Sequence, residues 1–119
     1  MEKRKYDLEE RLIGFVLLFD KITESLPSTR LANHLAGQIV RSSTSPALIY
    51  GEAQSAESQR DFIHKMQVIL KELRETKICL KIIIRKKYID THKTKPVLDE
   101  NEELIAISAQ SVKTAKSKL

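Results

Sequence analysis

The stretch SQRDFIHKMQVILKELRETKICLKIIIRKKYI, residues 58–89, decides the fold class of this chain. Its apolar side chains recur at steps of four and three residues, the period of one face of an α-helix. Ser58 followed by Asp61 is typical of a helix start, because the serine oxygen accepts a free backbone amide and the carboxylate lies near the positive helix end. We expect a helix from Ser58 to Tyr88 or Ile89. Its inward face would be Phe62, Met66, Ile69, Leu73, Thr76, Leu80 and Ile83.

Two more helices are predicted upstream. Residues 7–25 show the same spacing, and Pro27 then blocks continuation of the helix. Ser28 is placed to cap a second helix over residues 28–54, which Pro46 should kink because its ring removes a backbone donor. The predicted inward residues are Leu8, Leu12, Phe15, Phe19, Ile22 and Leu26 in the first helix, and Ala32, Leu35, Ile39, Ser42, Ile49 and Ala53 in the second.

A fourth helix is expected to begin near Pro96, after a polar, lysine-rich connection over residues 90–95. Carboxylates in its first turns, such as Asp99 and Glu100, favour a helix start. Four amphipathic helices joined by short connections predict an all-α protein, with residues 1–119 forming a single antiparallel up-down four-helix bundle with a kinked second helix. The predicted inward face of the fourth helix is Leu98, Ile105, Val112 and Leu119.

The composition restricts the class of protein further. The 119 residues are 41% hydrophobic and 31% charged with three Gly and three Pro, which excludes disordered and linker-rich chains. Cys79 is the only cysteine, so the chain has no internal disulfide and no cysteine-based zinc cluster. Because no run of about 18 apolar residues occurs, we expect neither a signal peptide nor contact with a membrane, and a cytoplasmic protein.

Candidate catalytic and metal-binding groups are few. Asp61 and His64 have a spacing that can serve a metal, but the predicted core offers no second pair, so we interpret them as a helix-start carboxylate and an exposed histidine. Glu72 and Glu75 are interpreted as ion-pair partners rather than an acid–base pair, which would need a pocket. Cys79 is expected to be a small packing residue. We therefore predict a protein that is not an enzyme and has no cofactor and no bound metal.

Positive charge is concentrated in one part of the chain. The net charge is +5, yet residues 71–95 hold nine basic and three acidic side chains. Basic residues spaced along one flank of the third helix can follow the phosphates of RNA or DNA without reading bases. The alternative is that these side chains serve subunit contacts or a protein partner in an interaction scaffold. The candidate nucleic-acid contacts are Arg74, Lys77, Lys81, Arg85, Lys86, Lys87, Lys93 and Lys95.

Two helices carry a second apolar face, which predicts a homo-oligomer. Acidic residues flank the face on the first helix and basic residues flank the face on the third, so the two surfaces complement each other. Two different complementary surfaces on one chain favour a head-to-tail contact that can close into a ring. The alternative is that a loop or a chain terminus covers one of them. The candidate interface residues are Tyr6, Ile13 and Leu17 on the first helix, and Ile78, Ile82 and Ile89 on the third.

The segment RSSTSPALIYGEA, residues 41–53, followed by Ser58, Asp61-Phe62 and the KELRET stretch at 71–76, resembles the bacterial 23S ribosomal RNA intervening-sequence proteins. The resemblance spans nearly the whole chain. It implies a small cytoplasmic four-helix bundle, similar to the accessory proteins of diversity-generating retroelements, which form five-membered rings that bind nucleic acid and a reverse transcriptase. It therefore implies a homopentameric ring, with RNA or DNA and a protein as partners, and provides no catalytic residue.

Overall fold

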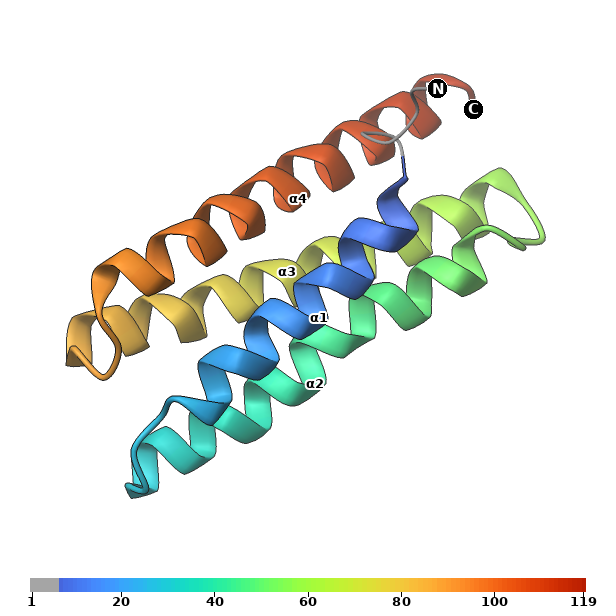
Figure 1. Cartoon of the computed structure of the whole chain (residues 1–119). Helices are drawn as coiled ribbons and strands as arrows, with labels where there is room; N and C mark the ends of the chain where they lie inside the picture. Colours follow the sequence, from blue (N-terminus) through green and yellow to red (C-terminus); the bar gives the residue numbers. More distant parts are fainter. Residues whose placement is uncertain (1–6) are drawn as a thin grey trace.

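The computed structural model describes residues 7–119, which form four α-helices and contain no strand. Their bounds are α1 Leu8–Glu24, α2 Arg30–Ala53, α3 Gln59–Lys86 and α4 Thr91–Ser117. Successive helices run in opposite directions along the bundle (Figure 1), and α1 also packs against α4, which closes it. The predicted antiparallel four-helix bundle is therefore confirmed. In this order α1 and α3 occupy diagonal corners, and so do α2 and α4.

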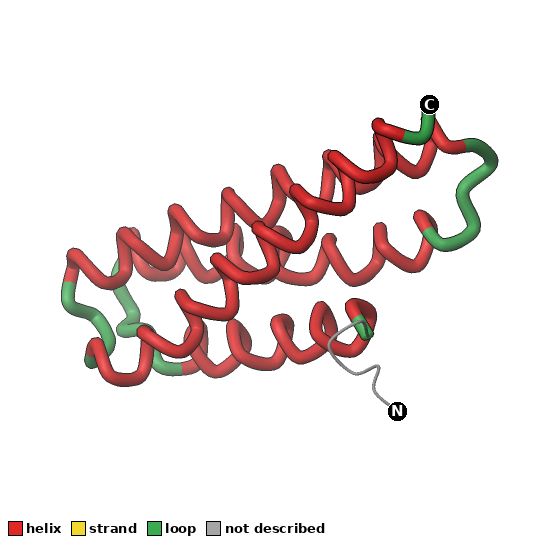
Figure 2. Tube along the Cα trace, turned by 90° about the horizontal axis from the view of Figure 1, so that it is seen from above, coloured by secondary structure: helices red, strands yellow, loops and turns green. Residues whose placement is uncertain are grey.

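The loops divide between the two ends of the bundle (Figure 2). The α1–α2 loop and the α3–α4 loop lie together at one end, whereas the α2–α3 loop lies at the other end, where α1 begins and α4 finishes. The molecule measures 47 × 31 × 19 Å along its principal axes. Residues at one end thus lie near the α1–α2 and α3–α4 loops, and residues at the other end lie near the α2–α3 loop.

Each helix starts at a residue whose side-chain oxygen accepts a backbone amide. Asp7, Thr29, Ser58 and Asp90 accept from the amides of Glu10, Ala32, Asp61 and His92, respectively. These bonds satisfy amides that lack a partner within the helix. The predicted cap at Ser58 is confirmed. The cap at Ser28 was wrong by one residue, because Thr29 has the extended backbone that directs its hydroxyl toward Ala32.

The core follows the predicted seams of α1 and α3. The buried residues of α1 are Leu8, Leu12, Phe15, Phe19 and Ile22, and those of α3 include Met66, Ile69, Leu73, Thr76, Leu80 and Ile83. The rings of Phe15 and Phe19 pack at a tilt with centroids 4.8 Å apart. Full burial of an apolar side chain contributes about 1.5–3 kcal/mol, so these two stripes provide much of the driving force for closure.

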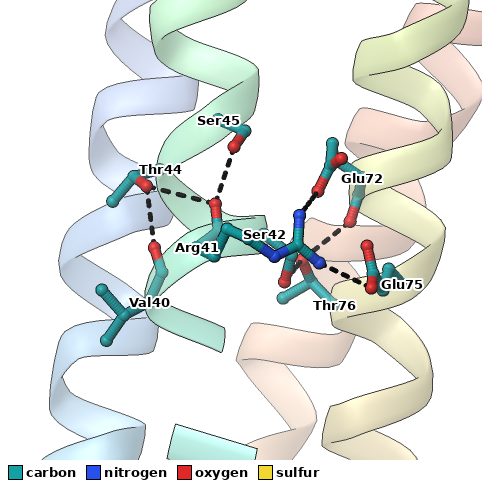
Figure 3. Close-up of polar contacts among 8 residues, drawn as sticks. All are labelled: Val40, Arg41, Ser42, Thr44, Ser45, Glu72, Glu75 and Thr76. Atoms are coloured by element: carbon teal, nitrogen blue, oxygen red, sulfur yellow. Dashed lines mark hydrogen bonds and ion pairs between the residues drawn. The ribbon is translucent and has the colours of Figure 1, made fainter. Parts of the chain in front are cut away.

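The serine-rich stretch of α2 packs against α3. Ser42, Ser43 and Pro46 are buried, and the Thr76 hydroxyl of α3 lies 2.7 Å from the Ser42 oxygen and 2.9 Å from the Glu72 carbonyl oxygen (Figure 3). Thr44 and Ser45 donate instead to carbonyls one turn back in their own helix. Small side chains let two helices approach closely, and these bonds satisfy the buried hydroxyl groups of Ser42 and Thr76. The helix continues through Pro46 without interruption.

The third helix ends earlier than predicted. Lys87 adopts the left-handed conformation at φ 58°, and the Tyr88 amide donates to the Ile83 carbonyl at 3.2 Å, which is a Schellman-type end. The chain then turns, so a helical projection no longer describes the residues that follow. Ile89, predicted on the outer face, is instead buried against the core. It is not part of an exposed interface.

The fourth helix begins at Thr91, so the predicted connection over residues 90–95 was wrong. Pro96 lies inside the helix. Its missing amide deprives only the His92 carbonyl near the exposed helix start, where water can replace it. The predicted inward face was also wrong except at Val112: Leu98 and Ile105 are half-buried and Leu119 is exposed. The buried residues are Thr94, Val97, Asn101, Leu104, Ser108, Val112 and Ala115.

Candidate functional site

Two of the eight predicted nucleic-acid contacts are held by carboxylates of α4. Lys77 Nζ lies 3.2 Å from Glu102 Oε2, and its side chain turns from α3 toward the neighbouring helix. Lys95 Nζ lies 2.8 Å from Asp99 Oδ1, one turn along its own helix. Both charges are thereby partly neutralised. Exposed pairs of this kind contribute about 0–1 kcal/mol to folding.

The other six basic side chains are exposed and form no ion pair within residues 7–119. Four of them, which we term the basic end, lie at the end of α3 and the start of α4, beside the α3–α4 loop. Lys86 Nζ stands 5.6 Å from the centroid of the Tyr88 ring, which holds the ammonium by a cation–π contact. The basic end is Arg85, Lys86, Lys87 and Lys93.

The exposed surface of α3 mixes apolar and basic side chains. Ile78 is 55% and Ile82 is 37% exposed, and together with Lys81 and Arg85 they line a groove of about 220 Å³. We term these four residues the α3 face. The apolar cluster and the middle of the basic row therefore occupy the same surface. A partner that covered Ile78 and Ile82 would also cover Lys81.

The complementary surface lies on α1 and reaches α2. Ile13 and Leu17 are exposed as predicted, and Leu17 lines a groove of about 250 Å³ between the two helices. Asp20 also lines this groove, which we term the α1–α2 groove, and it adds a negative charge to an apolar surface. Val40 of α2 lines it too and is 57% exposed. Sequence reasoning missed Val40, because a single apolar residue beside the α2 seam has no partner at helical spacing.

The remaining predicted interface residues do not join these surfaces. Tyr6 lies outside the described residues, and Ile89 belongs to the core. The α1–α2 groove lies between α1 and α2, whereas the α3 face lies on α3, which is diagonal to α1 and packs against α2. Most of the exposed candidate residues therefore lie on the α3 face, beside the α1–α2 groove or in the basic end, and Arg85 belongs to both the α3 face and the basic end.

Glu72 and Glu75 form ion pairs, but with a residue of α2. Arg41 Nη1 lies 2.8 Å from Glu72 Oε1, and Arg41 Nη2 lies 2.6 Å from Glu75 Oε2 (Figure 3). The hydrogen bond from Arg41 lowers the pKa of Glu75 below its usual range. These two ion pairs join α2 to α3.

Arg11 forms a similar link between α1 and α4. Its guanidinium binds Glu100 through two nitrogens, at 3.1 and 2.6 Å, and also contacts Glu103. These hydrogen bonds, with that to Glu100 foremost, raise the pKa of Arg11. The two-pronged geometry fixes the orientation of both partners, so this pair helps to set the register of α1 against α4.

The candidate metal and thiol groups have structural surroundings. Asp61 accepts from Lys65 Nζ at 2.9 Å and from the Glu57 amide at 3.1 Å, which lowers its pKa, and His64 is exposed. Cys79 is buried, which raises the pKa of its thiol. Among residues 7–119, no group of three or more His, Cys, Asp or Glu side chains is arranged to hold a metal ion.

Comparison with known families identifies the chain. The family model for 23S rRNA-intervening sequence proteins matches residues 4–110, which is most of its length. The chain belongs to this family. A solved structure from Bacteroides thetaiotaomicron VPI-5482, described as a protein with unknown function from the S23 ribosomal protein family, is similar at 26% identity with a TM-score of 0.78. The similarity covers 88% of this chain and 97% of that one. No curated protein matches the chain.

Membership explains why the sequence resemblance and the observed fold agree. The match to the 23S rRNA-intervening sequence family model includes all of α1, α2 and α3 and the part of α4 up to residue 110. None of the helices described in residues 7–119 is long and apolar enough to cross a membrane.

Proposed function

We propose that this member of the intervening-sequence family is a non-enzymatic homo-oligomer that binds the phosphates of RNA or DNA at its basic end. The observation that supports binding is the set of four exposed cations, Arg85, Lys86, Lys87 and Lys93, gathered where α3 meets α4. Cations without a carboxylate partner release the counterions of a phosphate backbone when they bind it, and this release provides affinity without base reading. The family name, which refers to an rRNA gene, is consistent with an RNA partner.

The proposed assembly uses the other two surfaces. The α3 face presents Ile78 and Ile82 beside Lys81, and the α1–α2 groove presents Leu17 beside Asp20. Both the apolar areas and the charges are complementary, so the α3 face of one copy fits the α1–α2 groove of the next. Such a head-to-tail contact repeats around a ring, and we propose five subunits because the family resemblance implies a pentamer.

In this proposal some of the basic residues serve the subunit contact, which was the alternative role for them, and the others bind nucleic acid. Lys81 lies among the exposed isoleucines and serves the subunit contact, whereas Lys86, Lys87 and Lys93 lie beyond it and remain accessible in the ring. A scaffold that bound only protein would use Lys81 but would have no need for a cluster of cations at one end of the bundle.

A pair of charge-reversal variants tests the binding proposal. The triple variant Lys86→Glu, Lys87→Glu, Lys93→Glu reverses three of the four charges of the basic end and leaves Arg85, which also lines the groove of the α3 face. The matched control reverses three exposed lysines at the opposite end, Lys113, Lys116 and Lys118, so that the net charge is the same in both proteins. Binding of labelled single-stranded RNA and duplex DNA is measured by fluorescence anisotropy over a series of salt concentrations.

The basic-end variant should lose binding and the control should keep most of it. Wild-type affinity should fall steeply with salt, since each phosphate contact releases about one counterion. Circular dichroism should show the same helix content in all three proteins, because exposed lysines contribute little to folding. Wild-type protein that binds neither probe at low salt, or two variants that lose binding equally, would contradict the proposal.

A further inference from the structure

A cavity of about 350 Å³ lies between the end of α1 and the start of α4, at the same end of the bundle as the basic end. Its deeper residues are apolar: Ile22, Ile89 and Val97 line it and are buried. Its size is near the lower limit of small-molecule sites, which run from roughly 300 to 1,000 Å³. The cavity therefore has room for one small group rather than an extended ligand.

The border of this cavity is positively charged. Lys21 of α1 and Lys93 of α4 both line it, are exposed, and form no ion pair with residues 7–119. Ser25 and Pro96 are also exposed on its border. An apolar interior bordered by two ammonium groups complements a ligand that combines a flat ring with a neighbouring anion.

Lys93 belongs both to this cavity and to the basic end. A strand whose phosphates contact Lys86 and Lys87 would pass Lys93 and reach the cavity within a few nucleotides. In a duplex the bases are stacked and paired, so only an unpaired nucleotide could place its base there. Enzymes that bind an extruded base hold it between aromatic or apolar side chains, which the cavity provides.

We propose that this cavity binds one unpaired base of a nucleic-acid strand, while Lys21 and Lys93 bind the phosphates on either side of that base. The inference rests on the proposed function, because it assumes that phosphates bind the basic end. It adds a preference for single strands, loops or bulges over uninterrupted duplex. It also adds Lys21 to the residues that contact nucleic acid.

Two probes separate base binding from phosphate binding. One is a labelled thymidine strand of about ten nucleotides, within the usual site size for single-strand binders. The other has the same number of phosphates but carries abasic residues throughout. The full-length protein should bind the thymidine strand about tenfold more tightly, because insertion of a base into an apolar site adds to the phosphate contacts.

A variant whose side chain fills the cavity tests whether the base binds there. Ser25→Trp places an indole at the exposed border, and Ser28→Trp is the matched control because Ser28 is exposed on the following loop and does not line the cavity. Ser25→Trp should lower the affinity for the thymidine strand to that for the abasic strand, whereas Ser28→Trp should leave the difference unchanged. If Ser25→Trp fails to fold by circular dichroism, Pro96→Trp fills the cavity from the exposed opposite side.

The outcomes distinguish the two proposals. If wild type binds neither probe, both the proposed function and the base site are wrong. If it binds the two probes equally, phosphate binding is upheld and the base site is wrong. If Ser25→Trp and Pro96→Trp both keep the wild-type preference for thymidine, the base lies elsewhere and the cavity assignment is overturned.

Discussion

Replacing Leu17 and Ile82 with glutamate should dissociate the proposed ring. Leu17 is 62% and Ile82 is 37% exposed in the isolated chain, so these are the fractions that a neighbouring copy can bury. Because full burial of such a side chain contributes about 1.5–3 kcal/mol, the two residues together contribute about 1.5–3 kcal/mol to each contact. The loss corresponds to a weakening of about 10- to 100-fold, before the cost of burying two carboxylates is added.

Light scattering over a range of micromolar concentrations measures the effect. The wild-type mass should be a multiple of 13.6 kDa and the double variant should approach the monomer. Leu119→Glu is the matched control, because Leu119 is 61% exposed but lies at the end of α4, away from both surfaces. All three proteins should show the same helix content by circular dichroism, since none of the changes reaches the core. A wild-type monomer, or a double variant of unchanged mass, would refute the assigned contact.

Three further changes test the fold and its ion pairs. In urea denaturation, Thr29→Ala should lower the free energy of unfolding by about 1 kcal/mol, because Thr29 caps α2, whereas Ser28→Ala should leave it unchanged. Equal effects of the two variants would place the cap elsewhere. Lys87→Gly should raise the free energy of unfolding by about 1 kcal/mol, since glycine adopts the left-handed backbone without strain. An unchanged urea midpoint would contradict this prediction. Glu75→Gln should lower the melting temperature at pH 7. The difference from wild type should shrink as the pH falls below 4.5, the ordinary pKa of a glutamate, because a carboxylate with a lowered pKa stabilises the fold only while it is ionised. A difference that does not change with pH would exclude the ion pair as its cause.

The seams of α1 and α3 were predictable because their inward residues are large and apolar and recur at helical spacing. A residue such as Phe15 or Leu73 signals its burial through its own side chain. The same spacing located the exposed cluster of Leu17 and the exposed cluster of Ile82, which lie off those seams. The spacing of apolar residues therefore predicts burial correctly where the buried side chains are the hydrophobic ones.

The inward face of α4 was not predictable on that basis. Four of its seven buried residues, at positions 94, 101, 108 and 115, are Thr, Asn, Ser and Ala, which are spaced by seven residues and lack a large apolar side chain. Asn101 Nδ2 donates to the Leu73 carbonyl of α3 at 3.1 Å, a partner that only the folded bundle provides. The more hydrophobic Leu98 and Ile105 lie beside this stripe and are half-buried. Tertiary contacts thus decided the orientation of α4.

The candidate sites were predictable in outline but not in their partners. The sequence locates Lys77 and Lys81 on one flank of a helix, yet only the packing of α4 shows that Lys77 meets Glu102 whereas Lys81 faces outward. The cavity between α1 and α4 joins residues more than sixty positions apart. Side chains so distant in sequence leave no local pattern that would reveal a shared pocket.

The even number of helices has a consequence for anything attached to this chain. Because α1 begins and α4 finishes at the same end of a molecule 47 Å long, a fused domain or a surface tether attached at Asp7 or Leu119 would start from the end opposite the basic end (Figure 1). Amino- and carboxy-terminal fusions should therefore be interchangeable in their effect on access to the α3–α4 loop. A label on either terminus would report on the orientation of the bundle without blocking that loop.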